Sequence, residues 1–125
     1  MPPPESIPSA PTELINHFKS GDVAVGVVGL GYVGLPLCNA FVKAGVRVIG
    51  VDIDPVKIAK LEKGESYLKY TDSDLTERLS TSDQFKPTTS FSDLQEADAI
   101  FICVPTPLGT HREPDLSYVL SLIHI

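Results

Sequence analysis

The sequence reads VAVGVVGLGYVG over residues 23–34, and this stretch decides the fold. Residues 23–28 are almost all apolar and mostly β-branched, which is typical of a strand buried on both faces of a parallel sheet. The glycine-rich turn that follows leads into an apolar run over residues 35–44, which predicts a largely buried helix. A second β-branched strand, residues 46–51, ends at Asp52. Strand, glycine-rich turn, helix and strand together predict a βαβ unit.

The glycine-rich turn has the spacing G-x-G-x-x-G, and each glycine has a separate physical role. Gly29 allows the tight turn out of the strand, and Gly34 lets the helix sit close to the strand. Gly31 has no side chain, so the pyrophosphate of a dinucleotide can approach the backbone there. The free N–H groups at the helix start then hold the phosphates without any lysine. The alternative is a glycine turn in an unrelated α/β protein, and the surrounding strands and helix argue against it.

Asp52 lies near the position, about 20 residues after the motif, where an acidic side chain binds the adenosine ribose. Its carboxylate can accept hydrogen bonds from the ribose hydroxyls, whereas it would repel a 2′-phosphate, so the sequence favours NAD over NADP. Lys57, one turn into the next helix, has two interpretations. It either reaches the adenosine side of the cofactor or is an ordinary solvated helix lysine.

The rest of the chain continues the alternation of helices and strands. The expected elements are a helix from Asp54-Pro55 to Gly64, a helix over 73–79, a short strand over 85–89, a short helix over 90–97, a buried strand over 99–104, a proline-rich loop over 105–114 and a helix capped by Asp115. This order predicts the α/β class, with a Rossmann-type doubly wound parallel sheet truncated after about four of the usual six strands.

Three regions are expected along the chain. Residues 1–21 form a Pro-rich, flexible or polyproline-II-like tail and then a short helix capped by Thr12. Residues 22–119 form an incomplete N-terminal NAD-binding domain. Residues 120–125 read LSLIHI, the string that the end adapter of sequencing libraries encodes, so we expect them to be non-native. The alternative for this last segment is a genuine apolar helix.

The composition excludes several classes of function. A net charge of −6 argues against nucleic acid or an anionic membrane as a partner, because both require a basic surface. No apolar run has the length of a membrane span, and no secretory signal is visible. Cys38 and Cys103 both lie in apolar segments, which predicts two buried thiols in a reducing cytoplasm. We therefore expect a cytoplasmic protein without a metal site.

Three blocks of sequence, in the right order, resemble the UDP-glucose/GDP-mannose dehydrogenase family. The blocks are VGLGYVGLPL at 28–37, DIDPVKI at 52–58, and CVPTPL at 103–108 followed by PDLSYV at 114–119. The VPTP block is the most specific of them, because general Rossmann dehydrogenases, including those acting on hydroxy acids, do not share it. The resemblance implies that Tyr32 and Val33 line the cofactor, that Asp52 and Lys57 are the adenosine-ribose pair, and that Val104, Pro105 and Thr106 lie along NAD after the fourth strand.

The family oxidises the C6 hydroxymethyl of a nucleotide sugar to a carboxylate with two NAD, through a thioester on a cysteine. That cysteine belongs to a glycine-rich motif that is absent here, so the resemblance places no catalytic residue in this chain. Cys103 is not a substitute, because a thiol inside a buried strand is expected to have a raised pKa and to be inert. The resemblance also implies a UDP-sugar substrate and a homo-oligomer for the full-length protein.

Two further segments suggest the branch of the family. Residues 64–68 and 108–118 look most like UDP-N-acetylhexosamine 6-dehydrogenases, which favours UDP-N-acetylglucosamine as the substrate. The alternatives are a UDP-glucose 6-dehydrogenase and a stand-alone NAD-binding module without catalysis. His111 and Arg112 are expected to lie in a solvated loop.

Overall fold

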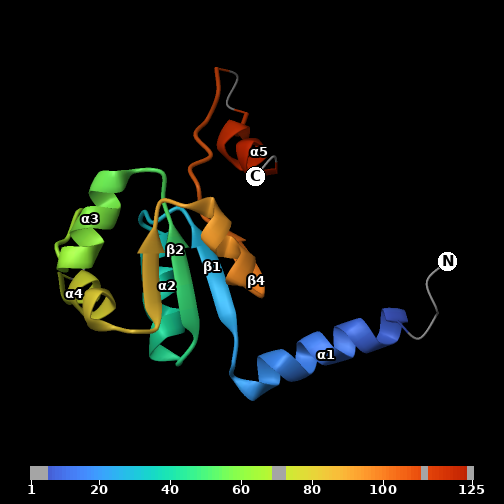
Figure 1. Ribbon diagram of the computed structural model, residues 1–125. Helices are drawn as coiled ribbons and strands as arrows, with labels where there is room; N and C mark the ends of the chain where they lie inside the picture. The colour runs from blue at the N-terminus through green and yellow to red at the C-terminus, as the bar shows by residue number, and fades with distance from the viewer. Residues whose placement is uncertain (1–5, 69–72, 111–112, 124–125) are drawn as a thin grey trace.

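A computed structural model describes residues 6–68, 73–110 and 113–123 of the 125-residue chain (Figure 1). Helices and strands alternate through most of it. In chain order the elements are α1 (Ser6–Ser20), β1 (Ala24–Val28), α2 (Gly34–Lys43), β2 (Arg47–Val51), α3 (Pro55–Lys63), α4 (Ser73–Thr81), β3 (Phe85–Thr88), the 3₁₀ helix η1 (Phe91–Glu96), β4 (Ala99–Ile102) and α5 (Ser117–Ile123).

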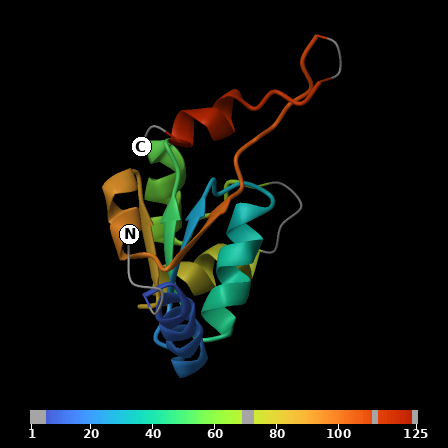
Figure 2. The same cartoon turned by 90° about the vertical axis from the view of Figure 1, so that its right-hand side faces the viewer.

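The four strands form one parallel sheet in the order β3-β2-β1-β4. The register places Val28, the last residue of β1, opposite Val51 and Ile102, so the carboxyl ends of the three strands lie together. Figures 1 and 2 show α2 on one face of the sheet, η1 on the other, and α5 above the carboxyl ends of the strands. This arrangement confirms the predicted α/β, Rossmann-like fold, since β1 is central and the chain crosses to either side of it.

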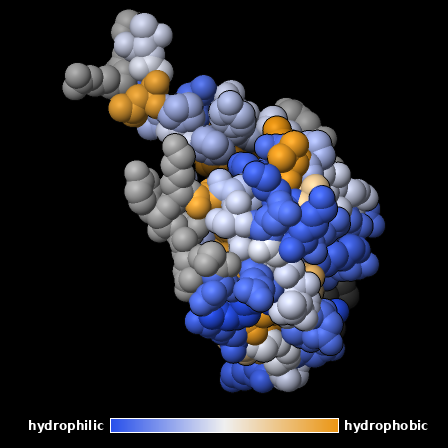
Figure 3. Space-filling view, turned by 90° about the vertical axis from the view of Figure 1, so that its left-hand side faces the viewer, coloured by the Kyte–Doolittle hydropathy of each residue, from blue (hydrophilic) through white to orange (hydrophobic). Residues whose placement is uncertain are grey.

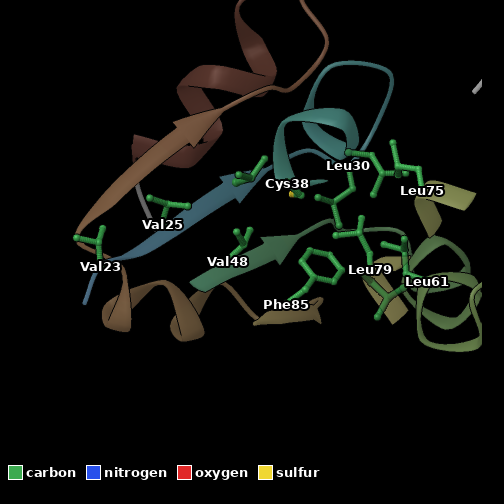
Figure 4. Packing of buried hydrophobic residues seen from close by; sticks show 12 residues of the cluster. Val23, Val25, Leu30, Cys38, Val48, Leu61, Leu75, Leu79 and Phe85 are labelled. Carbon is green, nitrogen blue, oxygen red and sulfur yellow. The ribbon is translucent and has the colours of Figure 1, made fainter. Parts of the chain in front are cut away.

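The main core lies between the sheet and helices α2, α3 and α4 (Figure 4). β1 is buried along its whole length, as the β-branched sequence predicted. The outer surface of α3 and α4 is mostly hydrophilic (Figure 3), so these helices bury one side only. Among the described residues, no helix has the length and apolar character that a membrane span requires. The buried members of the core are Val23, Val25, Val27, Leu30, Leu35, Cys38, Val48, Ile58, Leu61, Leu75, Leu79 and Phe85.

The boundaries of α3 follow the predicted capping residues. Asp54 is the N-cap, and its side chain accepts a hydrogen bond from the Val56 N–H at 2.9 Å. Pro55 occupies the first turn, where a missing N–H costs no helical hydrogen bond. Gly64 ends the helix with φ of 75°, a left-handed conformation in which a side chain would be strained. These caps fix α3 directly after β2, and so bring Lys57 close to Asp52.

The strand β4 differs from its prediction. Residues 99–104 were expected to form a buried strand, but the strand ends at Ile102, and Ile100 is 50% and Ile102 49% exposed. The reason is topological. β4 pairs with β1 on one side and has no strand on its other side among the described residues, so it is an edge strand. An apolar sequence indicates that a strand can be buried. Whether the strand is buried depends on the elements that pack around it in the fold.

The helix α1 is longer than predicted. It begins at Ser6 rather than at Thr12, so part of the segment expected to be a flexible, Pro-rich tail is helical. Pro8 stands in the first turn, where backbone N–H groups have no partner within the helix, so its missing N–H costs no hydrogen bond. Pro11 lies further along and removes one backbone hydrogen bond of the helix, but the helix continues past it. In Figures 1 and 2, α1 lies at the end of the sheet opposite α5. The predictions for Pro2, Pro3 and Pro4 lie outside the described residues.

One polar contact joins α1 to the sheet. His17 Nε2 lies 3.0 Å from Asp98 Oδ2, and this oxygen also accepts the Ala24 N–H at 3.0 Å. The amide of Ala24, with a smaller contribution from His17, holds the pKa of Asp98 below its usual value. The contact therefore links α1 to the starts of β1 and β4.

Candidate functional site

The turn between β1 and α2 has the close packing that the first and third glycines were predicted to allow. Gly29 has φ of 95°, and its N–H donates to the Val51 carbonyl at 2.8 Å. A Cβ at this position would lie 2.6 Å from the carbonyl oxygen of Cys103. A Cβ on Gly34 would overlap the carbonyl oxygen of Gly29. Only glycine fits at either position, and the result is a helix start packed directly on the end of β1.

The second glycine of the motif is different, because it faces open space. Among the described residues, and apart from Gly31 and its two chain neighbours, no atom lies within 4 Å of the position that a Cβ on Gly31 would take. Tyr32 and Val33, which follow it, are 57% and 68% exposed. The next residue, Gly34, begins α2, and the N–H groups of Leu35 and Leu37 donate to the carbonyls of Gly31 and Val33 at 3.1 and 3.2 Å. The turn therefore presents an open surface beside a helix N-terminus, the arrangement that suits a phosphate group.

Asp52 stands at the end of β2 with only 9% of its surface exposed. Its Oδ2 accepts the N–H of Leu30 at 3.0 Å, and its Oδ1 accepts the N–H of Asp54 at 3.0 Å. Lys57 Nζ lies 3.7 Å from Oδ2. The sequence predicted this carboxylate as a ribose ligand, but it did not reveal that the same group holds the glycine-rich turn. No sequence pattern indicates the contact between Asp52 and Leu30, because these two residues are 22 positions apart.

A cavity of about 420 Å³ lies at the carboxyl ends of β1 and β2. It brings together five of the predicted cofactor residues: Gly29, Asp52, Lys57, Val104 and Pro105. Sequence reasoning did not point to Phe91 of η1 or Tyr118 of α5, because their position depends on the fold, and Ser121 and Leu122 belong to the segment that was expected to be non-native. The further lining residues are Val28, Val51, Ile53, Asp54, Phe91, Tyr118, Ser121 and Leu122.

The remaining predicted residues lie outside this cavity. Gly31, Tyr32, Val33 and Gly34 belong to the turn beside it, and Thr106 is an exposed residue in the segment after β4. The structure thus places Thr106 near Pro105 in the chain but does not bring it onto the cavity wall. His111 and Arg112, which were expected in a solvated loop, lie outside the described residues.

The two cysteines are free thiols and are not activated. Burial, with a smaller contribution from nearby Cys103, raises the pKa of Cys38 far above its ordinary value. Cys103 lies just after β4 rather than within it, and its partial burial also raises its pKa. A raised pKa lowers the thiolate fraction at neutral pH, which is the opposite of what a nucleophile requires. Within the described residues, no three His, Cys, Asp or Glu side chains gather closely enough to hold a metal ion.

The sequence model of the UDP-glucose/GDP-mannose dehydrogenase family, NAD binding domain, matches residues 23–124. The chain belongs to this family. Its matched region is the NAD-binding domain, so the glycine-rich turn and the cavity lie in the part of the family that binds NAD. The match also includes most of residues 120–125, the segment whose origin stays a prediction.

Individual relatives support the family and divide over the sugar. The chain is 41% identical over 97 residues to UDP-N-acetyl-D-glucosamine 6-dehydrogenase of Pseudomonas aeruginosa, covering 77% of this chain and 22% of that protein. It is 36% identical over 106 residues to UDP-N-acetyl-D-mannosamine dehydrogenase of Campylobacter jejuni, covering 84% of this chain and 25% of that protein. The chain thus spans about a quarter of the length of these dehydrogenases, and they act on different sugars by name.

Solved structures of the family share the fold. A ternary complex of GDP-mannose dehydrogenase from Pseudomonas aeruginosa superimposes with a TM-score of 0.72 at 30% identity, covering 78% of this chain and 23% of that one. A UDP-glucose dehydrogenase from Pyrobaculum islandicum gives a TM-score of 0.75 at 29% identity, covering 80% and 24%. The family thus keeps this arrangement of strands and helices among members named for different sugars.

Proposed function

We propose that this chain binds NAD as the cofactor-binding part of a UDP-sugar 6-dehydrogenase. The pyrophosphate lies against the turn Gly29–Gly34, and the adenosine ribose lies in the cavity at Asp52. The observation that carries the proposal is the meeting of the turn, Asp52 and Lys57 at the carboxyl ends of β1 and β2. In open α/β sheets, ligands bind at this edge, where the strand order reverses.

The groups around Asp52 fit a ribose. Each carboxylate oxygen accepts one backbone N–H, from Leu30 or Asp54, and each oxygen has capacity for a further donor. The ribose hydroxyls are such donors. Lys57 balances the charge of the carboxylate from the α3 side. A 2′-phosphate would be repelled by Asp52, and this repulsion supports NAD rather than NADP as the cofactor.

When bound, NAD would supply the hydride acceptor for the sugar C6, and two such transfers, with one water providing the second oxygen, would take the hydroxymethyl to a carboxylate. The residues of this chain bind and orient the cofactor. We propose no catalytic residue among them, because both thiols have raised pKa values, the opposite of what an activated nucleophile requires. The sequence pattern at 64–68 and 108–118 favours a UDP-N-acetylhexosamine over UDP-glucose, and we propose UDP-N-acetylglucosamine as the substrate.

A second candidate is an NAD-binding module without chemistry. The same lack of an activated nucleophile among the described residues favours it. The two candidates differ in whether a glycine-rich motif with a cysteine belongs to the same protein. Reading the gene beyond the codon for residue 119 distinguishes them, because such a motif supports the dehydrogenase.

Asp52→Ala is expected to weaken NAD binding and to reduce the preference for NAD over NADP. A hydrogen bond to a charged group contributes about 1.5–3 kcal/mol, so we expect roughly a 10-fold to 100-fold loss of NAD affinity. Part of this loss arises through the turn, because Asp52 also holds Leu30. The ratio of NAD to NADP affinity isolates the ribose contribution, since the two cofactors differ only at the 2′ position.

Calorimetric titration with both cofactors measures the effect of Asp52→Ala. Asp22→Ala is the matched control, because Asp22 is an exposed carboxylate paired with Arg47 at 3.2 Å, away from the cavity. Unchanged NAD affinity together with an unchanged ratio for Asp52→Ala contradicts the ribose assignment.

Residues 1–125 alone are expected to show no dehydrogenase activity and to self-associate. Among the described residues the backbone of β4 is unpaired on one side, and its Ile100 and Ile102 side chains are about half exposed on a sheet face; an unpaired edge and an uncovered apolar face both promote aggregation. Size exclusion and an assay of NADH formation with UDP-N-acetylglucosamine, UDP-N-acetylmannosamine and UDP-glucose test both expectations. The Pseudomonas aeruginosa relative is the positive control, and Ile102→Lys should reduce the association. Turnover of any of these sugars by the monodisperse chain overturns the prediction.

A further inference from the structure

Tyr67 lies in the segment between α3 and α4 and makes a contact that joins this segment to the glycine-rich turn. Its hydroxyl donates a hydrogen bond of 2.6 Å to the carbonyl oxygen of Leu30, which is 37 positions away in the sequence. Leu30 is the residue between the first two glycines of the motif. The sequence pointed to Tyr67 only as part of a branch-specific pattern at 64–68 and predicted no role for it at the cofactor.

Leu30 is held at three points, and Tyr67 supplies one of them. Its N–H donates to Asp52 Oδ2 at 3.0 Å, and its side chain is 0% exposed. Figure 4 shows this side chain in the part of the core that also contains Leu61 and Leu79, from α3 and α4. The carbonyl is the remaining group, and the Tyr67 hydroxyl binds it. Together these contacts fix both peptide groups that flank Leu30.

The carbonyl of Leu30 belongs to the same peptide group as the N–H of Gly31. In a trans peptide these two groups point in opposite directions, and the chain has no cis peptide bond among the described residues. A hydroxyl that holds the carbonyl toward α3 and α4 therefore directs the Gly31 N–H away from them. A Cβ on Gly31 would meet no atom of the described residues within 4 Å, apart from those of its chain neighbours.

Lys57 lies close to both Asp52 and Tyr67, the two residues that bind the Leu30 backbone. Its Nζ lies 3.7 Å from Asp52 Oδ2 and 5.9 Å from the centroid of the Tyr67 ring. A cation at this distance from an aromatic face is attracted to it. Burial, followed by the nearby Asp52 carboxylate, raises the pKa of Tyr67 far above its ordinary value. A tyrosine hydroxyl is protonated at neutral pH in any case, and the raised pKa extends its donor form to more alkaline pH.

We propose that Tyr67 is a positioning residue for the pyrophosphate site, because its hydroxyl orients the Leu30–Gly31 peptide so that the Gly31 N–H faces the ligand. The inference rests on the proposed binding of NAD at this turn. It assigns to the α3–α4 segment a part in cofactor binding that does not require Tyr67 to touch the cofactor.

The test compares Tyr67→Phe with Thr76→Val. Tyr67→Phe removes the hydroxyl and keeps the ring. Thr76→Val is the matched control, because it removes a buried hydroxyl of α4 that donates to the Gly64 carbonyl at 3.3 Å, at the end of α3 rather than at the turn. Loss of one neutral hydrogen bond predicts NAD and ADP affinities weaker by roughly threefold to tenfold in Tyr67→Phe. Thr76→Val should bind both as the wild type does.

Two further measurements separate positioning from a general loss of stability. The ¹⁵N order parameter of Gly31 should fall in Tyr67→Phe and stay unchanged in Thr76→Val, because only the first frees that peptide. Binding of adenosine, which has no pyrophosphate, should be the same in both variants. Wild-type NAD affinity and an unchanged Gly31 order parameter in folded Tyr67→Phe overturn the proposal.

The outcomes also distinguish this inference from the proposed function. A wild-type chain that does not bind NAD contradicts the proposed function, and the Gly31 order parameter then tests the Tyr67 contact by itself. If Tyr67→Phe does not fold, the hydrogen bond of the Tyr67 hydroxyl can be tested in the wild-type chain instead. Its Tyr67 hydroxyl proton should exchange slowly enough with water to give a resolved NMR signal, and rapid exchange overturns the proposal.

Discussion

Gly31→Val is expected to abolish detectable NAD binding while the chain keeps its fold. The two parts of this expectation have separate physical reasons. The fold should persist because no described residue other than the chain neighbours comes within 4 Å of the new Cβ, and Gly31 is not among the glycines with positive φ. Binding should fail because the space that the valine fills is the space through which the pyrophosphate approaches the backbone.

The size of the effect follows from the phosphate contacts that are lost. Hydrogen bonds to a charged group contribute about 1.5–3 kcal/mol each, so losing two of them weakens binding by more than about 100-fold. Calorimetric titration with NAD gives the affinity, and circular dichroism with thermal melting checks the fold. Gly31→Ala is the graded control and should bind more weakly than wild type but better than Gly31→Val. A folded Gly31→Val chain with wild-type affinity would falsify the assignment of this turn.

Gly34→Ala, three residues further on, is expected to destabilise the fold itself. The added Cβ overlaps the carbonyl oxygen of Gly29, which is backbone and cannot rotate away. Gly29 in turn is fixed by its N–H bond of 2.8 Å to Val51 and by the close backbone of Cys103. Either α2 moves off β1 or the turn rearranges. Overpacking of this kind costs about 1–3 kcal/mol, and we expect the upper end.

Thermal and urea unfolding measure the loss in Gly34→Ala. For a domain of this size a change of about 3 kcal/mol lowers Tm by roughly 10–20 °C. Gly31→Ala is again the control, because it makes the same chemical change in the same turn but places its Cβ in open space. Its Tm should lie within a few degrees of wild type. Equal melting of Gly34→Ala and wild type would show that the helix does not pack on the turn as described.

The glycines of the turn have different roles. Gly34 and Gly29 serve the packing of the protein on itself, whereas Gly31 serves the approach of a ligand. The motif pattern alone does not divide them, because all three are glycines at fixed spacing. Their surroundings do, through the atoms that a side chain would meet.

The order of strands and helices follows from the sequence because it depends on local information. β-branched residues over 23–28 favour an extended chain, Gly29 allows the positive φ of the turn, and Asp54 with Gly64 sets the ends of α3. The sequence also selected Asp52, because a strand end followed by an acid is a local pattern. The 3₁₀ form of η1 and the start of α1 at Ser6 were less predictable, because short or proline-containing helices have weak local signals.

The tertiary structure alone decided which residues meet. The contacts of Leu30 with Asp52 and Tyr67 span 22 and 37 positions, and no local pattern encodes such distances. Likewise, the cavity includes Pro105 but leaves Thr106 outside, although the two are neighbours in the chain. The apolar strand β4 is half exposed because it lies at the edge of the sheet. A residue's conformation is set by its neighbours in the chain, whereas its burial and partners are set by packing between elements.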